Sequence, residues 1–169
     1  GWLVYGPGSG NWKISTTNKA GGDCNELMLY FDPSFNGTSR LVMKSVNLKD
    51  VENAVVSFKH YLDNFSGSSK IGIATSSDNG KTWNEVWSQT YSQTGYYAIN
   101  TVASTPDFGK SSVKFCLFFE GDSYNLYSWH FDDFEIFAQK NTDIRILSID
   151  IPDIAEAGMT EVKFTVQNV

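Results

Sequence analysis

The chain has 169 residues, with 13 basic and 19 acidic side chains and a formal net charge of −6. Hydrophobic residues make up 41% of it and charged residues 19%, which excludes a disordered chain. No apolar run approaches the roughly 18 residues of a membrane-spanning helix, so we expect no membrane insertion. The acidic balance leaves no basic surface for phosphate groups and argues against a nucleic-acid partner.

Eight segments read as β-strands, at residues 27–31, 41–46, 54–62, 70–75, 82–89, 96–102, 113–119 and 129–137. The evidence is the alternation of side chains between two faces. In the third segment, one face carries Val56, Phe58, His60 and Leu62. The seventh segment is apolar on both faces, which predicts a central strand. Turns rich in Gly and Asn separate the segments, and no helical period is sustained. The pattern predicts an all-β sandwich or barrel.

A domain boundary is expected near residues 139–142, giving domains 1–139 and 140–169. After the boundary come two strand-like runs, separated by Pro152 and a polar loop at 155–158. Two strands cannot form a core alone. We therefore expect a truncated immunoglobulin-like module here, or, alternatively, a hairpin docked on the first domain. The chain opens without a signal peptide, which suggests an excised piece of a longer protein.

Residues 76–83 fit the pattern S-x-D-x-G-x-T-W, known as the Asp box. In such a hairpin turn, Asp78 accepts bonds from backbone N–H groups, Gly80 takes a positive φ and Trp83 packs under the loop. Asp boxes recur in sialidase propellers, but a propeller needs one copy per blade and this chain has a single copy. We therefore interpret the motif as structural.

Catalytic motifs are absent from the sequence. His60 and His130 have no metal-binding or triad spacing, so we expect each to be a hydrogen-bonded strand residue. A glycosidase pair of carboxylates can be assembled only by the fold, and no spacing favours one. Cys24 and Cys116 lack a CxxC spacing; one long-range disulfide and two free thiols both remain open.

Adjacent acids stand out in the last predicted strand. Strict alternation places Asp132 and Asp133 on opposite faces, so one of them has to point towards an apolar interior. A buried carboxylate requires a cation or several hydrogen-bond donors, and calcium is the natural cation. Glu26 is a candidate second ligand, and Asp63 and Asp23 are weaker ones. The alternative is that these acids are solvated or cap amides at strand ends.

Aromatic side chains in or near turns are candidates for ligand contact. Tyr124 and Tyr127 follow a Gly-Asp turn, and Tyr96 lies in a Tyr-rich segment. With Trp129, they form the predicted ligand-binding set, which would stack on a sugar or a partner protein. The alternative is that these rings cover the ends of the sandwich.

An ordered series of motifs carries a family resemblance. It comprises Gly1-Trp2, Asn11-Trp12, Gly21-Gly22, Glu26-Leu27, the run from Ser34 to Leu41, Ser45 to Leu48, Phe58-Lys59-His60, the Asp-box hairpin, Trp87, Phe115 to Phe119, Gly121 to Asn125 and Trp129 to Ile136. Over about residues 1–139 the chain resembles the MAM-like jelly-roll domains of secreted bacterial proteins. These include the cleaved adhesin domains attached to surface proteases and haemagglutinins. Residues 143–168 resemble the start of the immunoglobulin-like modules that often follow.

The resemblance implies a two-sheet antiparallel jelly roll of the concanavalin or MAM type. It also implies a structural calcium, with Glu26, Asp132 and Asp133 at the positions of acidic ligands. Eukaryotic MAM domains carry four cysteines, whereas this chain has two, which favours the bacterial branch.

The function predicted in this way is a secreted or cell-surface adhesin-like module without catalytic activity. It would be stabilised by calcium, would bind a glycan or an extracellular host or matrix protein, and would belong to a longer parent chain. One alternative is an accessory or spacer domain of a secreted peptidase. The other is a jelly-roll glycoside hydrolase.

Overall fold

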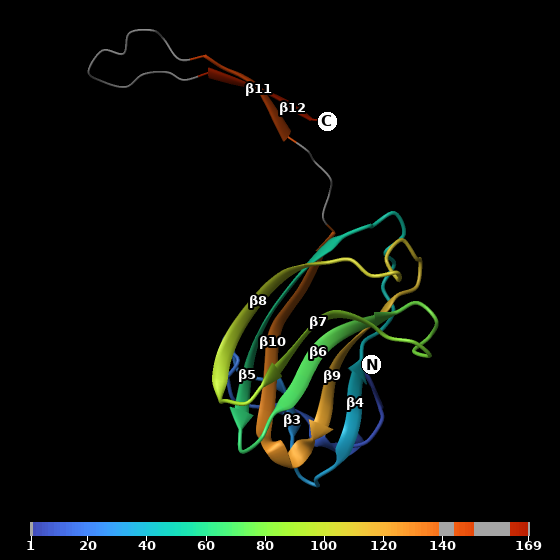
Figure 1. Ribbon diagram of the computed structural model, residues 1–169, viewed down its shortest axis with the longest axis vertical. Helices are drawn as coiled ribbons and strands as arrows, with labels where there is room; N and C mark the ends of the chain where they lie inside the picture. Colours follow the sequence, from blue (N-terminus) through green and yellow to red (C-terminus); the bar gives the residue numbers. More distant parts are fainter. Residues whose placement is uncertain (1, 139–143, 151–162, 169) are drawn as a thin grey trace, which may run out of the picture. The chain divides into compact units, whose positions relative to one another are not determined.

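The computed structural model describes residues 2–138, 144–150 and 163–168. The chain divides into two compact units, Gly1–Gln139 and Lys140–Val169. The first unit contains two five-stranded sheets (Figure 1). In the first, here the β9 sheet, the strand order is β1 (Leu3–Tyr5), β4 (Asn36–Val42), β9 (Lys114–Asp122), β6 (Ser69–Ser76) and β7 (Asn84–Tyr91). In the second, the β10 sheet, it is β2 (Trp12–Ser15), β3 (Glu26–Tyr30), β10 (Leu126–Ala138), β5 (Ala54–Asn64) and β8 (Gly95–Ala103).

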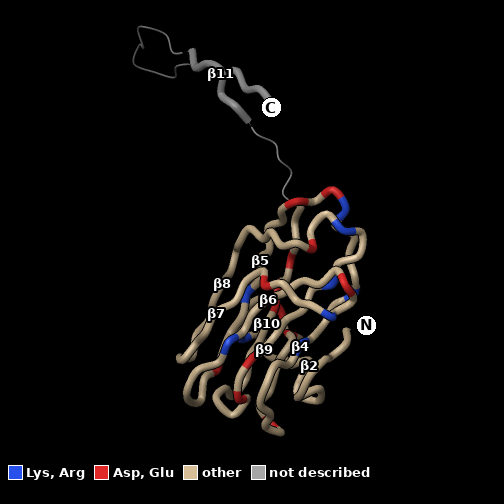
Figure 2. Tube along the Cα trace, turned by 45° about the vertical axis from the view of Figure 1, so that its right-hand side comes forward, with Lys and Arg blue, Asp and Glu red and all other residues tan. Residues whose placement is uncertain are grey.

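Every strand pair in the two sheets is antiparallel. This arrangement confirms the predicted fold class, an all-β two-sheet sandwich. Two short 3-10 helices, η1 (Ser9–Asn11) and η2 (Ser123–Asn125), connect strands of the unit. No helix among the described residues is long and apolar enough to span a membrane. Acidic and basic residues are interspersed along this unit (Figure 2).

The second unit contributes β11 (Ile144–Asp150) and β12 (Lys163–Asn168), which pair antiparallel. The polar loop expected at 155–158 lies outside the described residues. The immunoglobulin-like module therefore stays a prediction.

The main core lies between the two sheets. On β5, every second residue from Ala54 to Leu62 is buried, as the two-residue period predicts. The β9 side chains that face it include Phe115, Leu117 and Phe119, all buried in the same cluster. This interdigitation of two apolar faces is the main source of stability in a sandwich.

A second apolar cluster covers the outer face of the β9 sheet. Val42, Ala74, Cys116 and Phe118 are buried there, and Trp83 packs against them. Strand β9 is thus apolar on both faces and central in its sheet, as predicted. Cys116 is a free thiol in this cluster, and Cys24 is free and exposed, so the structure contains no disulfide between them.

A β-bulge in β10 corrects one expectation. The register of β10 against β5 shifts between Asp132 and Glu135, and Asp133 adopts a φ of 51°. The extra residue allows Phe131 and Phe134 both to pack on the core, although they are three positions apart. Asp132 is half-buried and Asp133 is exposed, so the prediction that one acid points into the interior is wrong.

Strands β1 and β2 are not among the eight segments predicted from the sequence, and β4 begins at Asn36, five residues before the predicted start at residue 41. Asn36-Gly37 is a dipeptide typical of turns, but in the structure both residues belong to β4 and pair with the end of β9. The φ of 122° at Gly37 explains how a strand accommodates this residue.

Candidate functional site

Glu26, the first predicted calcium ligand, lies at the start of β3 with its carboxylate buried. It accepts hydrogen bonds from the Thr17 hydroxyl, from the backbone N of Lys19 at 2.9 Å and from that of Ala20 at 2.7 Å. Burial acts to raise the pKa of Glu26, but the bonds from Thr17, Ala20 and Lys19 outweigh it and leave the pKa lowered. Glu26 is therefore an ionised anchor for the 17–20 segment.

His130 completes this cluster. Its Nδ1 lies 2.8 Å from the Glu26 carboxylate and its Nε2 lies 3.0 Å from the Ser128 hydroxyl. Burial lowers the pKa of His130 and outweighs the opposing attraction of Glu26. A neutral imidazole satisfies both contacts, because Nδ1–H donates to Glu26 and Nε2 accepts from Ser128.

Of the other three predicted calcium ligands, Asp132 and Asp133 both have carboxylate oxygens beside Gly22. Asp63 faces Lys19 Nζ at 3.6 Å, and Asp133 is paired with Lys59 Nζ at 2.6 Å. Asp132 accepts the backbone N–H of Asp133 at 2.9 Å.

Among the described residues, no three acidic, His or Cys side chains come together in a way that could hold a metal ion. Calcium takes six to eight oxygen ligands, so the four acids as placed do not fit the implied site. Glu26 instead accepts hydrogen bonds from groups of the protein itself. A buried carboxylate can be stabilised in this way, by several hydrogen-bond donors rather than by a cation. Calcium stabilisation stays a prediction of the resemblance.

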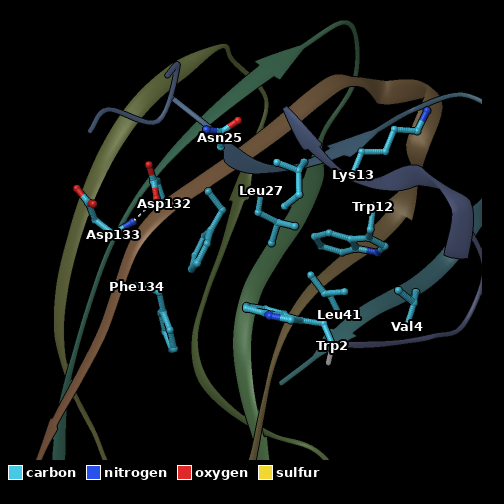
Figure 3. Close-up of a pocket in the computed structure, with 12 residues that line it drawn as sticks. Trp2, Val4, Trp12, Lys13, Asn25, Leu27, Leu41, Asp132, Asp133 and Phe134 are labelled. Carbon is cyan, nitrogen blue, oxygen red and sulfur yellow. Dashed lines mark hydrogen bonds between the residues drawn. The ribbon is translucent and has the colours of Figure 1, made fainter. Parts of the chain in front are cut away.

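The edge cleft is a cavity of about 410 Å³ lined by residues of β1, β2, β3, β4 and β10 and by residues next to these strands. Trp2 and Trp12 lie at one end, and Asp132 and Asp133 at the other (Figure 3). Leu27 lies between these two groups (Figure 3). Asn25 and Lys13 add polar groups to the rim of this largely apolar cavity.

The two tryptophans of the edge cleft differ in how firmly they are held. Trp12 donates its indole N–H to Ser39 Oγ at 2.9 Å and packs edge-on against Trp129, with ring centroids 5.9 Å apart. Trp2 is 52% exposed. Trp12 therefore forms a fixed wall, and Trp2 offers an open aromatic face to a ligand.

Left-handed backbone conformations place the polar groups of the cleft. Asn25 has a φ of 81° and Asp133 a φ of 51°, values that are uncommon for residues other than glycine. Asn25 belongs to the loop before β3 and Asp133 to the bulge of β10.

A second cavity, the end pocket, has a volume of about 160 Å³ and is lined by Phe31, Phe65, Tyr124, Leu126 and Tyr127. It brings together the predicted residues Tyr124 and Tyr127, both half exposed. Phe31 and Phe65 were not predicted. The only sequence signal for them is their aromatic type beside turns.

The remaining two predicted ligand-binding residues lie elsewhere. Tyr96 is on β8, half exposed and close to Gly21. Trp129 is 1% exposed and belongs to the main core. Its ring has no face free for a ligand, because alternation on β10 turns it inwards beside Phe131. The prediction that Trp129 contacts a ligand is therefore wrong for this buried position.

Comparisons with known proteins show the fold. No family model matches the chain, and no curated protein matches it. The K1 cleaved adhesin domain of Lys-gingipain from Porphyromonas gingivalis is a similar solved structure, with 16% identity, a TM-score of 0.58, and coverage of 82% of this chain and 91% of that one.

Carbohydrate-binding modules are similar as well. TmCBM61, solved in complex with β-1,4-galactotriose, has 22% identity, a TM-score of 0.55, and coverage of 82% of this chain and 88% of that one. The CBM22-1 xylan-binding domain of Paenibacillus barcinonensis Xyn10C has 14% identity, a TM-score of 0.54, and coverage of 81% and 85%. The first unit therefore has a jelly-roll fold of the kind found in carbohydrate-binding modules and in a cleaved adhesin domain.

Proposed function

We propose that this chain is a non-catalytic module that binds a glycan in the edge cleft. The observation that carries the proposal is Trp2, an exposed indole at one end of a cavity that is also lined by the polar groups of Asp132 and Asn25. A pyranose ring has an apolar face that stacks on an aromatic ring and hydroxyl groups that bond carboxylates and amides. Ligand sites combine apolar walls with a few such polar groups.

The size of the cleft supports the proposal. A volume of about 410 Å³ lies within the roughly 300–1,000 Å³ of small-molecule sites. The ligands named for the neighbours, β-1,4-galactotriose and xylan, supply the first probes. We place the module in a secreted or cell-surface parent chain, where a role as an accessory domain of a peptidase is the alternative. An extracellular protein ligand is the alternative to a glycan.

The test is affinity electrophoresis and calorimetry with β-1,4-galactan and xylan. We expect one of these glycans to bind. Trp2→Ala should weaken binding about tenfold, which corresponds to about 1.4 kcal/mol. Asp132→Asn should also weaken glycan binding. The matched control is Tyr124→Ala, which removes an aromatic ring of similar exposure from the end pocket and should leave glycan binding unchanged.

Two results would overturn the proposal. One is the absence of binding to either glycan, and the other is binding that Trp2→Ala leaves intact. Release of reducing sugar during the incubation would instead support the glycoside hydrolase alternative.

A further inference from the structure

The end pocket is a cluster of exposed aromatic rings from separate parts of the chain. Phe31 follows β3, Phe65 lies between β5 and β6, Tyr124 is in η2 and Tyr127 is near the start of β10. Phe65, Tyr124 and Tyr127 are 62%, 52% and 51% exposed. Single exposed aromatic residues scattered over a surface are ordinary, whereas several exposed rings gathered at one cavity indicate an interaction site.

Hydrogen bonds hold the segments that carry these rings together. The buried Ser123 accepts from the backbone N of Phe35 at 2.8 Å and donates to the carbonyl of Phe31 at 3.1 Å. The backbone N–H groups of Phe65 and Ser66 both donate to the carbonyl of Asn125, at 2.9 and 3.0 Å. The pocket is therefore organised before a ligand arrives, which reduces the ordering cost of binding.

The rings do not form a flat platform. Tyr124 stands at 78° to Phe31, with centroids 6.3 Å apart, and at 81° to Phe65, with centroids 5.4 Å apart. Their faces therefore point in different directions around the cavity. This geometry surrounds a compact group better than it stacks on a planar one.

The chemistry of the lining selects the kind of group. Apart from two tyrosine hydroxyls, the side chains that line the pocket are hydrocarbon. A sugar in this pocket would lose water from hydroxyl groups that find few partners, which is costly. A quaternary ammonium group carries a positive charge but no N–H, so aromatic faces alone stabilise it.

Charge around the pocket favours a cation. The Asp122 carboxylate holds the backbone N–H of Tyr124 at 3.0 Å, and Asp32 follows Phe31 directly. Tyr30, which lies next to the pocket without lining it, already has the Lys13 ammonium group 5.4 Å from its ring centroid. The Tyr30 ring in turn packs edge-on against Tyr127.

We propose that the end pocket binds a quaternary ammonium group of the choline type. The cavity of about 160 Å³ is smaller than the roughly 300 Å³ of the smallest drug-sized sites, which suits a single head group. This site is separate from the edge cleft and takes a different ligand, so neither proposal depends on the other.

The experiment is a titration of the full chain with choline and with its neutral isostere, in which carbon replaces the nitrogen. Tyrosine fluorescence and calorimetry report binding. We expect choline to bind at least tenfold more tightly than the isostere. Tyr124→Ala should weaken choline binding at least tenfold, whereas Tyr124→Phe keeps the ring and should retain it. Trp2→Ala is the matched control and should leave choline binding unchanged.

Equal binding of choline and its isostere would overturn the proposal, since only apolar contact would then operate. No choline binding to a folded wild-type chain would overturn it too. Loss of glycan binding in Tyr124→Ala, without choline binding in the wild type, would reassign the pocket to a sugar. Failure of the edge cleft would appear instead as unchanged glycan binding in Trp2→Ala.

Two further experiments test whether the quaternary ammonium group belongs to a lipid or to a soluble molecule. Co-sedimentation with phosphatidylcholine vesicles, but not with phosphatidylglycerol vesicles, would support a lipid head group as the source. Binding of soluble phosphocholine without co-sedimentation would support a free or glycan-linked source.

Discussion

His60 makes the stability of the first unit depend on pH. Its imidazole is fully buried on β5, stacked on Tyr97 and packed against Phe58 and Trp87. Burial lowers the pKa of His60 from 6.5 to about 4. The folded chain therefore keeps this side chain neutral at a pH where the unfolded chain protonates it.

The sign and size of the effect follow from linkage. Between pH 6.5 and about 4, the unfolded state binds more protons than the folded state, so stability falls as the pH falls through this window. At 1.36 kcal/mol per pKa unit, the difference corresponds to about 3 kcal/mol at pH 4 and below. For a domain of this size, that lowers the melting temperature by roughly 10 °C.

The assay is calorimetric melting of the wild type and of His60→Phe from pH 7 to pH 4. Phenylalanine retains the aromatic packing and removes the titrating group, losing only the 3.3 Å contact of Nε2 with the Tyr91 hydroxyl. His130 also has a lowered pKa, but its contribution is common to both proteins. We expect the variant to lose about 3 kcal/mol less across the window. Parallel curves for the two proteins would refute the reasoning.

Two further predictions concern acidic side chains, namely the buried Asp107 and the four candidate calcium ligands. Asp107→Ala removes the acceptor for Thr75 Oγ1 at 2.7 Å, Ser77 N at 2.9 Å and Asn84 Nδ2 at 2.9 Å. We expect a loss of about 3 kcal/mol in urea unfolding, and a loss below about 1 kcal/mol would show that water replaces the carboxylate. For calcium, no three acidic, His or Cys side chains among the described residues are placed to hold a metal ion, so this geometry predicts equal melting temperatures in calcium chloride and in chelator. A drop of several degrees in chelator, abolished by Asp132→Asn, would show instead that the acids rearrange around the ion.

The sequence predicted most of the strands because the two-residue period is a local signal. The alternation from Val56 to Leu62 and the two apolar faces of β9 required no knowledge of their partners. The bulge at Asp133 was out of reach, because it is defined by a register against β5. Strands β1 and β2 were missed because three or four residues are too few for a period to be recognised.

The candidate sites were only partly predictable for the same reason. Tyr124 and Tyr127 were identified from their place after a turn, but nothing local joins them to Phe65, almost sixty residues earlier. Trp129 is of a residue type that often contacts ligands, and only its position on β10 shows that its side chain faces inwards. The partners of Glu26 include His130, and that long-range pairing is a property of the fold.

The two thiols of the chain differ sharply in reactivity. Burial raises the pKa of Cys116 to about 12, whereas Cys24 is exposed. A maleimide dye will therefore label the native chain once, at Cys24. A second label requires Trp83 and the layer around it to move away from the β9 sheet. The rate of this second labelling therefore measures how often that layer opens transiently. Mass spectrometry can follow it without any substitution in the chain.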